Sequence, residues 1–175
     1  MLNRILLVLV VLVVGVGVLA LRQPDTFTVE RRVTMPVPPE KVFALVNDFR
    51  QWAVWSPWAT KDPQMQLAIS PQPAGVGATY EWHGNRDVGA GRMEIKESLP
   101  PNRVAIDLHF LAPIDSRSVM LMQIEPNDAG STVIWTMRGD NTLLSRIMSV
   151  FTSMDAMVGP DFDRGLAQLQ TAAAK

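Results

Sequence analysis

The hydrophobic pattern changes its period once, near the C-terminus, and this change limits the folds open to the chain. From residue 78 onward, apolar and polar residues alternate in short segments, which is typical of β-strands with one buried face. These predicted strands cover 78–83, 88–99, 103–110, 116–125 and 131–138. After them the apolar spacing becomes three or four residues, as on one face of an α-helix. The helical stripe consists of Leu144, Ile147, Phe151, Met154, Val158, Phe162, Leu166 and Leu169.

The pair Gly159-Pro160 interrupts this stripe without changing its phase. Proline removes a backbone donor and clashes with the preceding turn, so it kinks or ends a helix. We therefore predict one long helix kinked at Gly159-Pro160, or two helices nearly in line, rather than a reversal of the chain.

The preceding part of the chain predicts two further strands and two short helices. Residues 27–35 alternate between apolar and polar, which favours a strand, and 65–70 form a short one. Pro39 suits the first turn of a helix, because its missing N–H has no intrahelical partner there. Asn47-Asp48 then separates this helix from a second short one over 49–54, which carries the first of three closely spaced tryptophans.

The resulting order is strand, two short helices, about six strands and a long helix. A run of antiparallel strands with its helices kept to one side is an α+β arrangement. Gly89 and Gly91 within the strand at 88–99 indicate a bulge or a close backbone approach. A strongly bent sheet around an amphipathic helix encloses either a packed core or a cavity.

The N-terminus carries an uninterrupted apolar run from Ile5 to Leu21. Its length is at the short end for a membrane-spanning helix, which needs roughly 20 residues. A signal peptide cut after Val18-Leu19-Ala20 is the alternative. We favour the anchor, because the run continues to Leu21 with no polar region before that site. We therefore divide the chain into a segment over 1–22 and a domain over 23–175, and place the domain outside the cytoplasm.

Composition excludes several function classes. The formal net charge is −1 and there is no basic cluster, which argues against nucleic acid as a partner. The chain has no cysteine, no nucleophile motif and no cluster of metal-ligand residues in sequence, so we expect no metal and no cofactor.

Several motifs resemble the START/Bet v 1-like superfamily, also called SRPBCC or polyketide-cyclase-like. The similarity covers nearly everything from Phe27 to Ala174. The segments that carry it are Val29-Glu30-Arg31, residues 38–43, residues 48–52, Trp55-Ser56-Pro57-Trp58, residues 75–78 and residues 162–169. The resemblance implies a helix-grip fold, in which a curved seven-stranded antiparallel sheet surrounds a long C-terminal helix. It also implies a cavity for lipids, sterols, polyketides or other apolar molecules.

Candidate ligand-binding residues come from the strands and the helix that would line such a cavity. Methionine fills irregular space and adapts to varied ligands, although an ordinary core explains the chain's ten methionines equally well. The tryptophans at 52, 55 and 58 pack the helix pair against the sheet or form a lid. The residues that we predict to contact a ligand are Trp82, Phe110, Met120, Trp135, Phe151 and Met154.

Three functions remain open, because members of this superfamily include carriers, enzymes and co-chaperones. The first is a membrane-tethered domain that binds or transports an apolar or lipid-like small molecule. The second is a polyketide cyclase- or hydrolase-like enzyme, which needs a titratable group in the cavity. Its candidates are Glu81, His83 and Asp155. For these residues a solvent-exposed position without a catalytic role is the favoured alternative. The third is a protein-interaction module without a ligand.

Overall fold

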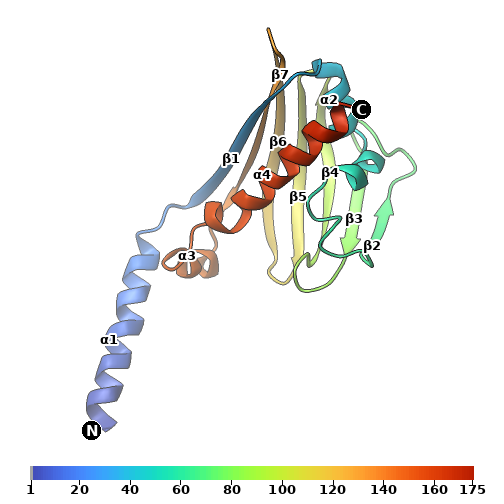
Figure 1. Ribbon diagram of the computed structural model, residues 1–175. Coiled ribbons are helices and arrows are strands. Elements are labelled where there is room, and N and C mark those ends of the chain that lie inside the picture. The colour runs from blue at the N-terminus through green and yellow to red at the C-terminus, as the bar shows by residue number, and fades with distance from the viewer. Residues whose placement is uncertain (1) are drawn as a thin grey trace.

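A computed structural model describes residues 2–175, and its centre is one curved antiparallel sheet of seven strands (Figure 1). The strand order is β1-β7-β6-β5-β4-β3-β2, so the first strand pairs with the last. The strands are β1 (Thr26–Met35), β2 (Gln66–Ile69), β3 (Thr79–His83), β4 (Ala90–Leu99), β5 (Arg103–Ala112), β6 (Ser116–Asn127) and β7 (Gly130–Asp140).

Five helices lie before, between and after the strands, in the part of the chain that the structure describes. They are α1 (Leu2–Leu21), α2 (Pro39–Val46), the 3-10 helix η1 (Phe49–Val54), α3 (Leu143–Ser149) and α4 (Met154–Ala173). Figure 1 shows α4 crossing one face of the sheet, with α2 near its C-terminal end. The predicted α+β class and the helix-grip architecture are confirmed.

Irregularities in β4 help the sheet to curve. The pairing of β4 with β5 shifts register between Ala90 and Gly91 and again between Ile95 and Glu97. Such bulges bend a strand and increase its twist. A side chain at Gly91 would overlap with the indole of Trp82 and with the backbone carbonyl of His109, so the glycine permits the predicted close approach.

The α2–η1 pair is fastened to the core by its tryptophans. Asp48 caps η1 by accepting a hydrogen bond from the backbone N–H of Arg50 at 2.9 Å. The indole N–H of Trp52 donates to the carbonyl of Val46 at 2.9 Å, and that of Trp55 donates to the carbonyl of Leu45 at 3.1 Å. Both rings are buried, so packing rather than a mobile lid accounts for them.

The C-terminal helical region breaks at a different place from the predicted one. The helix continues through Gly159-Pro160, and the break lies earlier: α3 ends at Ser149, and α4 begins after Ser153, whose side chain accepts a hydrogen bond from the N–H of Ala156. Pro160 lies inside α4. Part of the clash between a proline ring and the preceding residue involves that residue's Cβ, and Gly159 has none. The predicted break position was therefore wrong.

The hydrophobic core lies between the sheet and α4, and its buried residues run from Val29 to Ala173. The N-terminal helix α1 stands outside it. Its apolar side chains from Ile5 to Val14 are exposed, and Ala20 alone among its described residues is fully buried. Arg4–Leu21 is long and apolar enough to cross a membrane, a property that signal sequences share.

Candidate ligand cavity

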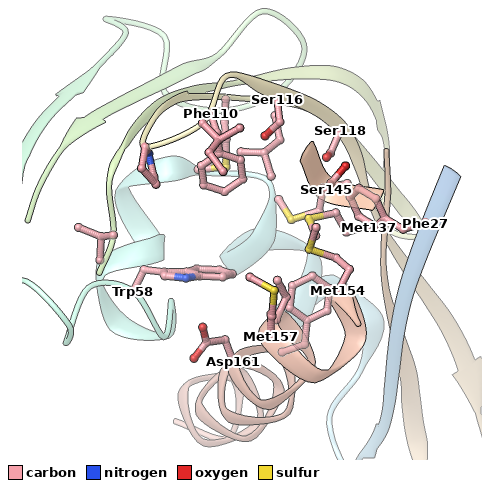
Figure 2. Close-up of a pocket in the computed structure, with 18 of the residues that line it drawn as sticks. Phe27, Trp58, Phe110, Ser116, Ser118, Met137, Ser145, Met154, Met157 and Asp161 are labelled. Atoms are coloured by element: carbon pink, nitrogen blue, oxygen red, sulfur yellow. The ribbon is translucent and has the colours of Figure 1, made fainter. Parts of the chain in front are cut away.

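A cavity of about 300 Å³ lies between the sheet, η1 and the N-terminal part of α4. Aromatic residues and methionines make up half of its lining (Figure 2). The aromatic residues are Phe27, Trp52, Trp58, Tyr80, Trp82, Phe110 and Phe162. The methionines are Met65, Met93, Met120, Met137, Met148, Met154 and Met157, which are most of the ten in the chain. An apolar cavity with flexible thioether walls suits a small apolar ligand.

Ring-to-ring contacts hold the aromatic walls in place. Trp82 meets Phe110 edge-on with ring centroids 5.6 Å apart, and its indole N–H donates to the carbonyl of Val88 at 3.0 Å. On the other wall, Trp58 meets Phe162 edge-on at 6.4 Å. Edge-to-face pairs of this kind add stability beyond the area they bury. The cavity therefore has rigid walls on two sides, and its methionines are the adaptable part.

Polar groups interrupt the apolar lining at several places, which include Ser56, Asp140 and Thr152. Figure 2 shows the hydroxyls of Ser116, Ser118 and Ser145 lying across the cavity from Asp161. Asp161 is mostly buried, and its carboxylate accepts a hydrogen bond from the Lys61 ammonium at 2.6 Å. The lining residues within the described part of the chain include no lysine, arginine or histidine. The polar groups offered to a ligand are thus hydroxyls and the carboxylates of Asp140 and Asp161, and Lys61 compensates the second of these.

Four of the six residues predicted to contact a ligand line this cavity. They are Trp82, Phe110, Met120 and Met154. Trp135 lies one layer behind the wall, fully buried and stacked on Phe162 with ring centroids 4.1 Å apart. Phe151 falls in the break between α3 and α4, where its side chain is 75% exposed. Ligand contact by the four lining residues stays a prediction.

The candidate catalytic residues lie outside the cavity. Glu81, His83 and Asp155 are all exposed, and none of them lines it. Asp155 accepts a hydrogen bond from Nη1 of Arg31 at 2.7 Å, and this bond lowers the pKa of the Asp155 carboxyl. The geometry gives a catalytic role for these three residues no support. In the described residues, no group of three histidine or acidic side chains is placed to hold a metal ion.

Sequence reasoning missed Trp58, Asp161 and the hydroxyls as lining residues. A signal for Asp161 was present, because Met154, Met157 and Asp161 follow one another at spacings of three and four and so share a helix face. Its partner Lys61 is 100 residues away in sequence, and no spacing rule connects the two.

Sheet, helices and cavity together define an α+β helix-grip domain with an apolar interior site. The chain belongs to the family described as polyketide cyclase / dehydrase and lipid transport, whose model matches residues 26–174. A search of curated proteins finds no match.

Solved structures share the fold at low sequence identity. The crystal structure of protein CV1439 from Chromobacterium violaceum is 16% identical, with a TM-score of 0.60 over 87% of this chain and 99% of that one. The solution structure of the Aha1 dimer from Colwellia psychrerythraea is 17% identical, with a TM-score of 0.60 over 84% and 96%. The crystal structure of Ara h 8.0201 is 16% identical, with a TM-score of 0.56 over 85% and 95%. These Bet v 1-like neighbours establish the architecture.

Proposed function

We propose that this protein is a membrane-tethered domain that binds an apolar or lipid-like small molecule in the cavity between the sheet and α4. The observation that carries the proposal is the cavity itself, about 300 Å³ of space with aromatic and methionine walls. The family description, which includes lipid transport, supports the same class of ligand.

The lining favours a ligand with an apolar body and a neutral polar group. Hydroxyls such as those of Ser116 and Ser118 can donate and accept hydrogen bonds, so they suit an alcohol, a ketone or an ester. An anionic head group would find no cationic side chain among the described lining residues, and it would meet the carboxylate of Asp161. The volume is at the lower end of the roughly 300–1,000 Å³ usual for ligand sites, so it suits a compact ligand or one end of a longer one.

The tether in this proposal is α1. Its 20 residues span about 30 Å at 1.5 Å per residue, which equals the thickness of a bilayer's hydrocarbon core. Apolar residues occupy all sides of this helix, and those from Ile5 to Val14 are exposed in the isolated chain. Retention of this helix would keep the cavity beside the bilayer, where apolar molecules are concentrated.

A pair of neighbouring substitutions on β6 tests the cavity. Met120 faces the cavity and Val119 faces the opposite side of the sheet, half exposed. A domain consisting of residues 23–175 is suitable for the test, because all residues of its core lie within it. Met120→Trp fills the cavity, whereas Val119→Trp adds the same ring outside.

We expect native mass spectrometry to find a co-purified apolar molecule with the unsubstituted domain and with Val119→Trp. With Met120→Trp that molecule should be absent, and binding of the neutral dye Nile red should weaken by at least about tenfold, a loss of about 1.4 kcal/mol. Circular dichroism confirms that both variants are folded. Equal dye binding by the two variants, or no bound molecule and no dye binding in any form, would contradict the proposal.

A further inference from the structure

The helix α3 has apolar side chains but buries none of them. No residue of Leu143–Ser149 is buried, Leu143 is 64% exposed, and Phe151 follows at 75%. A surface helix of a globular protein normally turns its apolar stripe inward. Apolar side chains that gather on an exposed surface instead indicate an interaction site. We call Ile114, Leu143, Leu144, Phe151 and Met157 the apolar rim, because all five are exposed.

The apolar rim lies where the cavity reaches the surface. Ile114, in the turn between β5 and β6, and Met157, on α4, are exposed and also line the cavity. On α3 itself, Ser145 and Met148 face the cavity while Leu143 and Leu144 face outward. The same short helix is therefore both a wall of the cavity and part of its outer edge.

The position of α1 indicates what covers this rim. α3 contacts α1, and Figure 1 shows it beside the C-terminal end of that helix. Ala20, in the last turn of α1, is fully buried, whereas the side chains from Arg4 to Val14 are exposed. If α1 spans a bilayer, its last turn lies at the membrane surface, since its length matches the hydrocarbon thickness. A helix that touches this turn must then lie at the same depth.

We infer that the apolar rim docks into the bilayer that holds α1, so that the cavity opens directly onto the membrane. This inference rests on the proposed function, because it specifies where the ligand comes from. An apolar molecule would pass between membrane and cavity without crossing water. Arg22 follows α1 directly and is exposed, and Arg146 projects from α3 and pairs with Asp25. Cationic side chains at this level suit the head groups of an anionic bilayer.

The absence of cysteine from the sequence makes a direct depth measurement feasible. Full-length chains carrying Phe151→Cys, Leu143→Cys or Leu99→Cys are synthesised in a cell-free reaction with preformed nanodiscs, which retains the N-terminal segment. Each cysteine receives an environment-sensitive fluorophore. Leu99 is the matched control, because it is also exposed and apolar but lies at the far end of β4 from the rim. The near end of β4 is Ala90, which pairs with Ala112, two residues before Ile114 of the rim.

Labels at 143 and 151 should be quenched several-fold more strongly by lipids with a nitroxide near the head group than the label at 99. Aqueous iodide should quench them in the reverse order. Phe151→Glu should reduce lipid quenching of the label at 143 several-fold, and Leu99→Glu should not. Labels at 143 and 151 that iodide reaches as readily as the label at 99 would overturn the inference. Protection from both quenchers would also overturn it, because a second copy of the chain would then cover the rim.

These readouts do not depend on what occupies the cavity. Lipid quenching at 143 and 151 without a difference between Met120→Trp and Val119→Trp in Nile red binding would refute the proposed ligand and leave the docking intact. The converse result would refute the docking and leave the ligand intact.

Discussion

Tyr80 is the chain's single tyrosine, and it reports on the interior of the cavity wall. Its ring lies against Phe49, Trp52 and Trp82, with centroids 5.5 to 6.3 Å away. Burial among these rings disfavours the charged phenolate and raises the pKa of Tyr80 to about 12. A group whose pKa is higher in the folded state stabilises the fold fully below its unfolded pKa, here about 10, and this contribution is lost as pH rises from there through the folded value.

We therefore expect the unsubstituted protein to lose stability between about pH 10 and pH 12, beyond the loss shown by Tyr80→Phe. The extra loss is on the order of 2 kcal/mol, as two pKa units imply. Denaturant unfolding of both proteins across this range measures it, while tyrosinate absorbance follows the phenol of the folded protein. Titration of Tyr80 near pH 10, or identical alkaline profiles for the two proteins, would show that the ring is not buried in this way.

At the scale of elements, a single arginine connects α4 to the edge of the sheet. Arg31 on β1 donates to both carboxylate oxygens of Asp155, at 2.7 and 3.0 Å, and to Asp163 at 3.2 Å. Its guanidinium lies against Gly159, where any side chain would overlap with it. These hydrogen bonds raise the pKa of Arg31 and lower that of Asp155. The clamp therefore forms at neutral pH and is lost as pH falls through the lowered pKa of Asp155.

Arg31→Gln should loosen the N-terminal half of α4 and leave the sheet unchanged. We expect amide hydrogen exchange over residues 154–163 to rise several-fold at neutral pH, because partly exposed ion pairs control local opening more than global stability. Arg32→Gln is the control, since Arg32 is exposed and reaches only Glu30, at 3.4 Å. Acidification should lower the protection of residues 154–163, measured relative to the intrinsic exchange rate at each pH, in the unsubstituted protein and in Arg32→Gln, but should have little further effect in Arg31→Gln. Unchanged exchange in Arg31→Gln would show that the hydrogen bonds of Arg31 to Asp155 and Asp163 do not hold the N-terminal half of α4 in place.

The strands could be predicted better than the C-terminal helices. Alternation within each strand is a local signal, and the predicted strands agree with the observed ones apart from a few terminal residues. The contact of Arg31 with Asp155, 124 residues away, lies beyond any local pattern. The helical break was misplaced because the apolar stripe keeps its phase through it, while the cap that begins α4 is the single residue Ser153. Phe151 was assigned to the stripe for the same reason.

The cavity shows a related limit of the sequence. Alternation identified which face of each strand is apolar, and four predicted residues do line the space. The pattern did not separate Trp82 and Phe110 at the wall from Trp135 behind it, since all three occupy apolar faces. That distinction depends on how closely Trp135 and Phe162 stack, and hence on how α4 sits over the sheet.

At the scale of the whole molecule, the structure suggests that the folded domain and α1 are energetically almost separate. All residues of the core lie between Val29 and Ala173, and among the domain's helices and strands α1 makes its substantial contacts with α3. The family match likewise begins only at residue 26. Deletion of residues 1–22 should therefore leave the stability of the sheet and α4 unchanged. α3 should respond, because it has no buried side chain of its own.

Thermal unfolding of residues 23–175 should be cooperative, with a midpoint within about 2 °C of that of the full chain, a difference of at most about 1 kcal/mol for a protein of this size. Hydrogen exchange over α3 should rise several-fold in the shortened chain, while exchange in β5, β6 and β7 stays unchanged.

A chain that begins at residue 36 and so also lacks β1 is the contrasting case. In that chain β7 loses its partner along residues 131–140, and Val29 is missing from the core. That chain should not fold cooperatively. If exchange over α3 is the same with and without α1, the contact between the two helices does not hold α3 in place, and the depth of α3 in the membrane cannot be argued from it.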